Sequence, residues 1–367
     1  MAEEFVPAAP APLAYPALHG LRGLAAGWVL LFHLSAVFPT FDKALIDHLG
    51  SVVGGLLLNF VVIFGWVGVA LFFALSGFLL GGQWLARPQQ SFGRYCLRRA
   101  ARLYPAAWLQ LAVFAVLLPW LPTGLFPVAQ GGAWWFTQLS LSFDLPPFFV
   151  RPWNGVWWTL PVELSFYLIL PALTQLLGRI GWFAMLTLGL LLSIGWRWAV
   201  ILLDPDDNKL AALAALNSLP GSLSIFIAGL VVAKGFGAWP RPSRHWLWLA
   251  LAAWLLLAWW MLSSKNDYWS GGWPLASWNA LAGLLMAALV WLVADDRGWL
   301  AGKLAYWAGE RSYGIYLWHL PILMLIHAYA PNLGLGPSIG LALALIVLAA
   351  ECSYRLVERH AMAFAKR

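Results

Sequence analysis

Ten long apolar stretches run along the 367-residue chain, and they restrict its possible folds more than any other feature. Each stretch has roughly the 20 residues that a helix needs to cross a hydrocarbon core about 30 Å thick. Hydrophobic residues make up 62% of the chain and charged residues only 10%, which excludes an ordinary soluble domain. The sequence therefore predicts an all-α integral membrane protein, a bundle of about ten transmembrane helices. The expected spans are approximately 18–38, 60–82, 97–120, 160–178, 181–203, 213–233, 246–263, 274–294, 312–330 and 338–358.

The basic residues predict the orientation of this bundle. With the N-terminus in the cytoplasm, the outer loops hold only Lys43, Arg151, Lys209 and Lys265 of the 22 lysines and arginines. The positive-inside rule then predicts that both termini are cytoplasmic. Because the basic residues are spread over many short loops, we expect no nucleic-acid surface. The two cysteines stand in no metal-ligand pattern, so no metal site is expected.

Three regions are expected along the chain. Residues 1–17 are predicted to be a disordered cytoplasmic tail, because they are rich in alanine and proline and lack the positive region of a secretory signal. Residues 18–360 form the transmembrane domain, and 361–367 form a second cytoplasmic tail. The apolar segment 45–64 stays ambiguous, because it could extend the second span or form a separate re-entrant or interfacial helix.

The first span carries two ionisable side chains, Arg22 and His33, inside an otherwise apolar helix. They are eleven residues apart, which at about 100° per residue puts both on the same side of the helix. His33 lies roughly 16 Å along the axis from Arg22, near the middle of the membrane. An ionisable group at that depth is costly unless it faces a polar cavity or a partner, so His33 is a functional candidate. The alternative is a histidine that packs between helices and hydrogen-bonds to a neighbour.

A basic cluster opens the third span, where Arg98, Arg99 and Arg102 lie within one helical turn and a half of each other. Arg99 and Arg102 are i, i+3 neighbours, so at least two guanidinium groups share a face. Guanidinium groups bind phosphate through two parallel hydrogen bonds, which favours a phosphorylated cytoplasmic ligand. The alternative is ordinary positive-inside flanking with contacts to anionic lipid.

Two further polar sites lie within expected spans. Glu163 and Tyr167 are one turn apart in the fourth span, and Glu163 is geometrically allowed to pair with His33 and orient it as a base. It could instead brace the start of its helix. Near the C-terminus, His319 shares a face with Ser312 and Tyr316, which favours a polar network between helices slightly over direct chemistry.

Six motifs occur in order along nearly the whole chain, each on an expected span. They are Leu21-Arg-Gly-Leu-Ala25 with His33, Gly65-Trp-Val-Gly-Val-Ala-Leu-Phe-Phe-Ala-Leu-Ser-Gly-Phe-Leu79, Arg98-Arg-Ala-Ala-Arg-Leu-Tyr-Pro105, Trp158-Thr-Leu-Pro-Val-Glu163 with Phe166-Tyr167, Ser312-Tyr-Gly-Ile-Tyr-Leu-Trp-His319 and Ser353-Tyr-Arg-Leu-Val-Glu-Arg359. Through them the chain resembles the acyltransferase 3 family of integral membrane acyltransferases, which modify bacterial cell-surface glycans and some small molecules. The resemblance implies a ten-helix bundle in the bacterial inner membrane.

The resemblance also implies a reaction. Acyl-CoA, most simply acetyl-CoA, is the expected donor substrate, with its phosphates held by Arg99, Arg102 and Arg98. His33 would deprotonate a hydroxyl of a glycan or lipid-linked glycan acceptor, with Glu163 beside it. Arg22 would line the donor channel, and Tyr167 and His319 would contact substrate. No cofactor is expected besides the donor. A double displacement through an acyl-histidine stays open.

Two departures from the family pattern stand out. An acidic residue usually follows Gly-Val in the second motif, and here that position is Ala70, so Asp42 or Asp47 is a candidate replacement. The final motif usually ends in proline, and here it ends in His360. The sequence also contains none of the appended soluble hydrolase-like domains that some members carry, so transfer would occur within the bundle or through a partner. A transporter or flippase, and a subunit that only relays acyl groups, are the alternatives.

Overall fold

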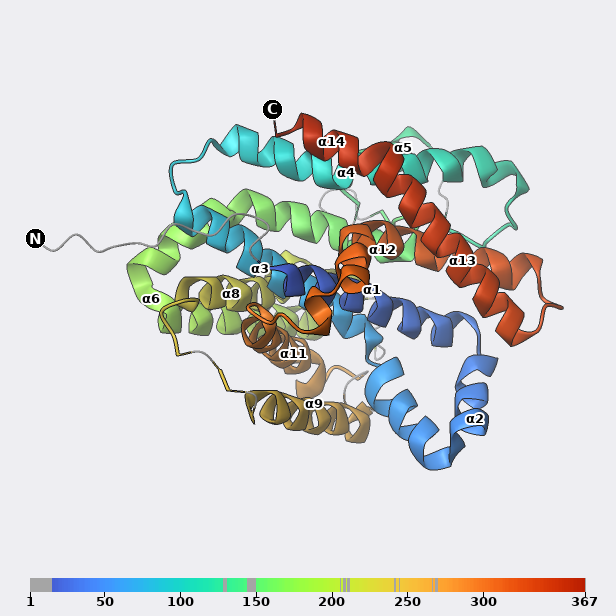
Figure 1. The fold of residues 1–367 in the computed structure, drawn as a ribbon, viewed down its shortest axis with the longest axis horizontal. Coiled ribbons are helices and arrows are strands. Elements are labelled where there is room, and N and C mark those ends of the chain that lie inside the picture. The colour runs from blue at the N-terminus through green and yellow to red at the C-terminus, as the bar shows by residue number, and fades with distance from the viewer. Residues whose placement is uncertain are drawn as a thin grey trace, which may run out of the picture.

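The computed structural model describes residues 15–127, 131–143, 150–204, 206, 209, 212–240, 242, 243, 245–265, 267 and 270–366, and these residues form helices and no strand. The N-terminal tail expected at 1–17 lies mostly outside the described residues, and the first helix begins at Pro16. Figure 1 shows helices running in several directions around a central group. The helices are α1 (Pro16–Val37), α2 (Thr40–Leu57), α3 (Gly68–Ala86), α4 (Phe92–Leu117), α5 (Gly132–Ser140), α6 (Thr159–Leu203), α7 (Leu213–Leu216), α8 (Leu219–Gly235), α9 (His245–Ser263), α11 (Trp273–Val293), α12 (Lys303–Tyr329), α13 (Leu335–Ser353) and α14 (Arg359–Phe364).

Short segments of other helix types connect these elements. Two are π-helical, at Leu58–Val62 and Tyr354–Glu358, and four are 3₁₀ turns, at Gly65–Val67, Leu118–Trp120, Gly155–Trp158 and Trp299–Ala301. The second π-helical segment joins α13 to α14 without a break, so the helix continues through His360 where the family pattern has proline. Proline lacks the N–H that a continuing helix needs, whereas histidine supplies it.

The described residues contain eight helical segments that are long and apolar enough to cross a membrane, which confirms a multi-pass membrane protein. Two of them, Thr40–Ala86 and Gly155–Leu203, hold 47 and 49 residues, about twice the length of one crossing. The ten expected stretches fall on helical segments, except that turns interrupt 60–82 at 63–64 and 213–233 at 217–218. Two of them correspond to the two arms of α6, and one corresponds to α12, in which charged residues lower the hydropathy.

Two glycines divide the long segments. Gly181 has a φ of 81°, a left-handed conformation that a helix cannot continue through, and Figure 1 shows the chain of α6 turning back there. Gly50 has a φ of 80° and bends α2 into two short arms. The ambiguous segment 45–64 therefore contains the end of the first arm of α2, the bend at Gly50, the second arm and the π-helical turn after it. The expected single helix over 60–82 is wrong in its first part, because the chain turns at Ile63–Phe64 and α3 begins only at Gly68.

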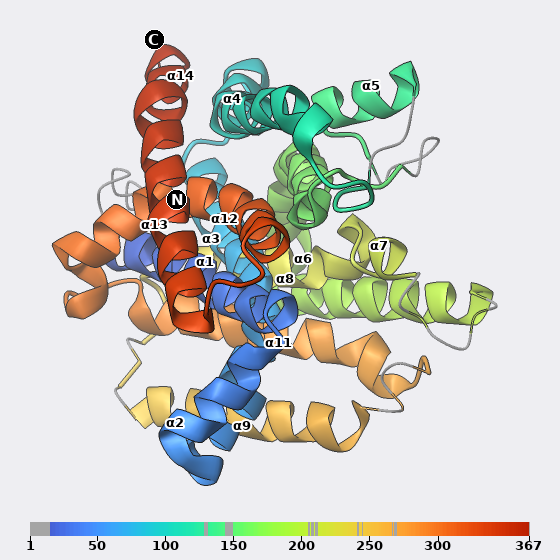
Figure 2. The ribbon, with the colours of Figure 1, turned by 90° about the vertical axis from the view of Figure 1, so that its right-hand side faces the viewer.

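Helix α1 lies at the centre and packs along α12 on one side and α3 on the other (Figures 1 and 2). Glycines allow the close approach that holds these helices together. A Cβ atom on Gly309 of α12 would lie 1.9 Å from the carbonyl oxygen of His19, and one on Gly77 of α3 would lie 2.1 Å from that of Phe226 in α8. Small residues at such crossings are typical of membrane helices, which associate through close van der Waals packing.

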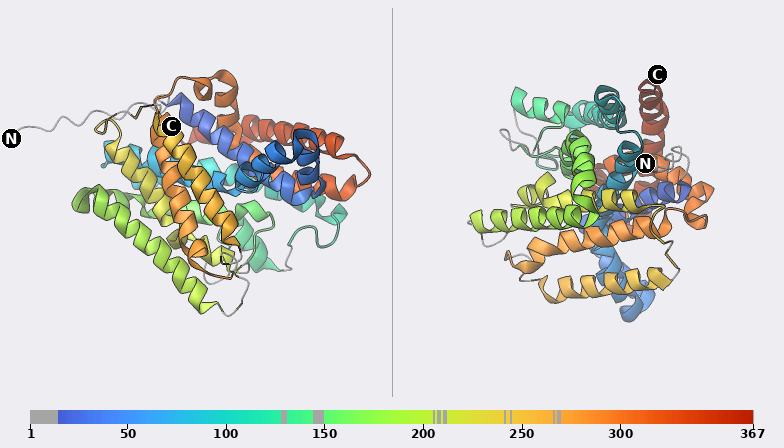
Figure 3. Two further views of the ribbon diagram at one scale, coloured as in Figure 1. Left: turned by 90° about the horizontal axis from the view of Figure 1, so that it is seen from below. Right: turned by 90° about the vertical axis from the view of Figure 1, so that its left-hand side faces the viewer.

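The remaining helices surround this centre. Figure 3 shows α9 beside α11 on the side of the bundle away from α4, and α9 is the most exposed of the long helices in apolar side chains. A small apolar cluster joins the C-terminal ends of α1 and α12 to the N-terminal part of α13. It contains Leu34, Phe38, Leu323, Ile326, Ala342 and Ile346.

Candidate active site

Two histidines from the central helices meet inside the bundle. Nε2 of His319 lies 3.1 Å from Nδ1 of His33, and the two ring centroids are 4.9 Å apart. His319 on α12 is completely buried, whereas His33 on α1 is partly accessible. The structure thus joins two residues that the sequence placed in separate motifs. Because His33 keeps an accessible edge, it is the member of the pair that a substrate can reach.

A proline in α12 explains how the backbone beside His319 is held. Pro321 has no N–H, so the carbonyl of Leu317 one turn earlier receives no helical hydrogen bond. Two buried amides donate to it instead, from Gln110 at 2.6 Å and from Asn154 at 3.0 Å. The indole of Trp157 donates to the side-chain oxygen of Gln110 at 2.7 Å. These bonds tie α12 to α4 and to the segment before α6, two residues from His319.

Removing one of these amides should weaken the tie. Gln110→Leu is expected to lower stability by about 1–3 kcal/mol and to reduce turnover, because it deprives the Trp157 indole and the Leu317 carbonyl of a buried partner. Thermal unfolding and transfer rate in detergent would measure both. In the Pro321→Ala background the helix supplies an N–H to Leu317, so the same substitution should cost less. An equal cost in both backgrounds would contradict this account of the proline.

Tyr316 also holds α12 against the start of α6 and the segment before it. Its hydroxyl donates to the carbonyl oxygen of Val156 at 2.7 Å and lies 3.1 Å from the hydroxyl of Thr159. Its ring centroid is 5.9 Å from that of His319. Ser312 instead bonds to the backbone of its own helix, at the carbonyl of Gly309. The polar network expected around His319 therefore includes Tyr316 and omits Ser312.

Glu163 lies in a different polar group from the histidines. Its carboxylate accepts hydrogen bonds from Ser76 on α3 at 3.1 Å and from Tyr167 one turn along α6. The i, i+4 proximity of Glu163 and Tyr167 follows from their spacing. Among the described residues, no hydrogen bond joins Glu163 to His33, and the position beside His33 belongs to His319. The pairing that the sequence allowed is thus not the one formed here.

A group of arginines gathers around Glu163 at the other end of α1. The charges of Arg102, Glu163 and Arg99 all act on Arg22. Within the described part of the chain, the buried Nε atoms of Arg22 and Arg99 have no hydrogen-bond partner. Buried donors of this kind are costly unless a ligand or water accepts from them. The pair therefore presents two positively charged donors for an anion.

The other two arginines of the cluster already have protein partners. Arg98 donates to the side-chain oxygen of Gln90 at 3.1 Å. Arg102 donates to the buried carboxylate of Glu358 at 3.2 Å, and Ser353 donates to the other oxygen of that carboxylate at 3.0 Å. The structure thus separates the arginines that the sequence treated together, because only Arg22 and Arg99 keep unsatisfied buried donors.

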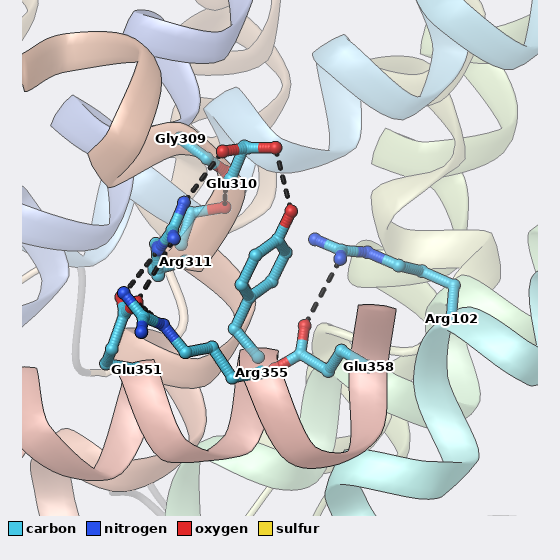
Figure 4. Close-up of polar contacts among 9 residues, drawn as sticks. Arg102, Gly309, Glu310, Arg311, Glu351, Arg355 and Glu358 are labelled. Carbon is cyan, nitrogen blue, oxygen red and sulfur yellow. Dashed lines mark hydrogen bonds and ion pairs between the residues drawn. The ribbon is translucent and has the colours of Figure 1, made fainter. Parts of the chain in front are cut away.

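Figure 4 shows that the Arg102–Glu358 pair borders a larger ionic network between α12 and the end of α13. Arg311 makes two hydrogen bonds to Glu351, at 2.8 and 3.3 Å, and a third to Glu310 at 2.7 Å. Tyr354 donates to Glu310 at 2.8 Å, and its ring lies under the Arg311 guanidinium. These bonds hold the first part of α12 against the end of α13 and the π-helical segment that follows it.

Sequence reasoning missed several of these residues. Gln110, Asn154, Ser76 and Glu358 all contact the polar groups described above, but each lies far along the chain from its partner. Pro321 was the available signal for the first two, because it predicts an unpaired carbonyl within the span. Ser76 and Glu358 stand inside the second and sixth motifs, but neither motif predicts the partner that each contacts.

The position that departs from the family pattern is apolar in its surroundings. Ala70 is buried in the apolar core on α3. Asp42, one of the two suggested replacements, accepts a hydrogen bond from Ser35 at 2.7 Å, two residues beyond His33 on α1. Asp42 therefore contacts the C-terminal end of α1. Its role as a replacement for the acidic residue of the family pattern stays a prediction.

The acyltransferase domain model of the Acyl_transf_3 family matches residues 15–354. The chain is therefore a multi-pass membrane protein that carries the domain of this family over nearly its whole length. It belongs to the acyltransferase 3 family, which confirms the resemblance carried by the six motifs. No solved structure matches the chain.

Curated relatives align over most of the chain. A peptidoglycan O-acetyltransferase, OatA, of Listeria monocytogenes is 26% identical over 94% of this chain and 55% of its own length. The O-acetyltransferase OatA of Staphylococcus aureus is 24% identical over 95% of this chain and 57% of its own length. Nodulation protein 10 of Rhizobium leguminosarum is 28% identical over 75% of this chain and 76% of its own. The chain thus spans little more than half the length of the two O-acetyltransferases.

Proposed function

We propose that this protein transfers an acyl group, most simply acetyl, from cytoplasmic acyl-CoA to a hydroxyl of a cell-surface or exopolysaccharide glycan at the bacterial inner membrane. Family membership and the names of two relatives, which are O-acetyltransferases, support the reaction class. The glycan acceptor is supported by the Listeria relative, whose name specifies peptidoglycan. Acyl-CoA as the donor rests on the chemistry of the site.

One observation carries the proposal. The partly accessible His33 and the unsatisfied donor of Arg22 lie toward opposite ends of the same helix, α1, and Arg99 on α4 holds the second unsatisfied donor. His33 and Arg22 are separated by roughly 16 Å along that helix. A donor whose phosphates sit at Arg22 and Arg99 would extend its thioester along α1 toward His33. With the N-terminus in the cytoplasm, the arginines face the compartment that contains acyl-CoA, and the acceptor arrives from the other side.

The reaction at His33 balances as a direct transfer. His33 takes the proton of the acceptor hydroxyl while the oxygen attacks the thioester carbonyl. The resulting tetrahedral intermediate breaks its carbon–sulfur bond, and the thiolate of CoA leaves. The imidazolium of His33 returns its proton to that thiolate. The products are an O-acyl ester and free CoA, and the histidine is restored to its neutral form.

Reconstitution in lipid vesicles tests the function. Purified protein would receive radiolabelled acetyl-CoA on one side and polysaccharide or peptidoglycan fragments on the other. We expect an alkali-labile labelled ester on the glycan, formed only when the donor is on the side of the N-terminus. Movement of unmodified glycan across the vesicle without ester formation would replace the enzyme with a transporter. Label retained on the protein until a second protein is added would indicate an acyl relay.

The donor site has its own prediction. Arg22→Gln and Arg99→Gln should each weaken acetyl-CoA binding by at least about tenfold, because a charge-assisted phosphate contact is lost. Acceptor KM should change little. Arg94→Gln is the matched control, since Arg94 is exposed at the start of the same helix as Arg99. Equal donor affinity in all three variants would leave these arginines as topology signals only.

A further inference from the structure

The hydrogen bonds of the histidine pair determine where its protons lie. A backbone carbonyl oxygen can only accept a hydrogen bond, so a ring nitrogen beside one must carry a proton. Nδ1 of His319 lies 3.1 Å from the carbonyl oxygen of Ile315, and this nitrogen is therefore protonated. In a neutral imidazole the other nitrogen is then a bare acceptor. Nε2 of His319 accordingly presents its lone pair to His33.

The same reasoning applies to His33 and gives a consistent answer. Its Nδ1 lies 3.1 Å from the accepting Nε2 of His319 and 3.0 Å from the carbonyl oxygen of Val29. Both neighbours can only accept, so the proton of His33 is on Nδ1. The Nε2 atom of His33 is left unprotonated. It is the atom that can take a proton from a substrate hydroxyl.

We propose that His319 is a positioning residue, which fixes the tautomer and ring orientation of His33 and stabilises the imidazolium formed during transfer. This inference rests on the proposed function. It assigns to a neutral histidine the orienting part that a carboxylate plays beside many catalytic histidines. As His33 Nε2 gains the acceptor proton, its Nδ1–H becomes a stronger donor toward His319. No proton needs to move to His319.

The surroundings of His319 suit this role. It is completely buried, and the bonds of Tyr316 and of the Leu317 carbonyl hold the turn of α12 that precedes it. Its own Nδ1–H is committed to Ile315, which prevents the ring from flipping without loss of a hydrogen bond. A substrate contact, the part first expected of His319, would need an accessible atom that it does not have.

Substitutions at position 319 separate orientation from packing. His319→Leu fills space but cannot accept the proton of His33, whereas the amide oxygen of His319→Gln can reach the position of Nε2. We expect His319→Leu to lower kcat by about 10- to 100-fold, the range typical when a partner that orients a functional histidine is lost. KM for donor and acceptor should stay unchanged, and His319→Gln should recover most of the rate. His327→Leu is the matched control, because His327 is exposed two turns further along α12 and only its ring edge contacts Phe38.

A spectroscopic measurement decides the tautomer without any assay. Nitrogen-15 NMR of histidine-labelled protein in lipid nanodiscs, with His33 assigned through the His33→Ala variant, should report the Nδ1–H form in the wild type and in His319→Gln. An Nε2–H form of His33 would overturn the proposal. So would a His319→Gln variant that is folded and as slow as His319→Leu, or a His319→Leu variant with wild-type kcat.

The kinetic and the NMR experiments together keep this inference distinct from the proposed function. If the wild type transfers no acyl group, the function fails while the NMR result still decides the tautomer. If the wild type is active and His33→Ala is not, the function stands whatever the variants of His319 show. Should His319→Leu fail to fold, the rate and spectrum of His319→Gln remain decisive.

Discussion

His33→Ala is expected to lose acyl transfer almost completely while the protein still folds and inserts. A positioned general base contributes about 10²–10⁴-fold to a rate, and His33→Ala removes the nitrogen proposed to take the hydroxyl proton. His33→Gln should be equally inactive, because an amide can hydrogen-bond but cannot accept a proton near neutral pH. The rate of ester formation in vesicles, at saturating donor and acceptor, measures the effect.

The cost of these substitutions in stability should be small. His33 is partly accessible and its side chain makes two polar contacts, so we expect a loss of about 1 kcal/mol. Thermal unfolding and donor binding would check that the variants keep the native bundle. A His33→Ala variant with substantial activity would exclude the mechanism. A labelled acyl group trapped on His33 would replace direct transfer with the two-step route.

The pH dependence of the wild type follows from the same role. His33 must be neutral to accept a proton, so activity should rise with pH as the imidazole loses its proton. The rate should therefore show an acidic limb that reflects one group. In His319→Gln the limb should remain, because the base itself is unchanged. A pH-independent rate across the range in which an imidazole titrates would contradict a histidine base.

Much of the fold could be predicted, because the hydropathy of about 20 consecutive residues is enough to predict a membrane helix. Most of the expected apolar stretches fall on one helix or one arm of a helix, and Gly181 marks the turn between the two arms of α6. The bend at Gly50 and the late start of α3 at Gly68 were not predicted. The bend follows from the left-handed backbone of Gly50, which hydropathy does not mark, whereas the start of α3 depends on how closely one backbone approaches another. A Cβ on Gly65, for example, would lie 2.2 Å from the carbonyl oxygen of Trp28, a distance set by packing between helices rather than by hydropathy.

The contacts of the site also divide into those that the sequence predicts and those that it does not. Contacts within one helix were predictable, as for Glu163 and Tyr167 at i, i+4. The partner of His33 was not, because His319 lies 286 residues away and several polar residues were placed at similar depth. Arg102 was predicted to bind phosphate, with positive-inside flanking and lipid contact as the alternative, because its neighbours on α4 indicate no acidic partner. Its partner Glu358 comes from the far end of the chain, 256 residues later.

Breaking the Arg102–Glu358 pair should produce the largest loss of stability. The Glu358 side chain is 1% exposed and that of Arg102 is 14% exposed, so either charge left alone would be poorly solvated. Removing one partner of a buried ion pair costs about 3–5 kcal/mol. We expect Glu358→Ala to show a loss of this size in unfolding experiments in detergent. Replacing both residues with leucine should recover much of it, because no charge is then left buried.

Glu351→Ala is a suitable comparison, because the Glu351 side chain is 20% exposed and Arg311 would keep its ion pair with Glu310 at 2.7 Å. Its loss of stability should be smaller. Donor affinity then separates the two possible roles of Arg102. If the pair is structural, Glu358→Gln should bind acetyl-CoA as tightly as the wild type. Tighter binding would mean that Glu358 competes with the donor for Arg102, and the donor site would then extend from Arg22 and Arg99 to all three arginines that act on one another at this end of α1.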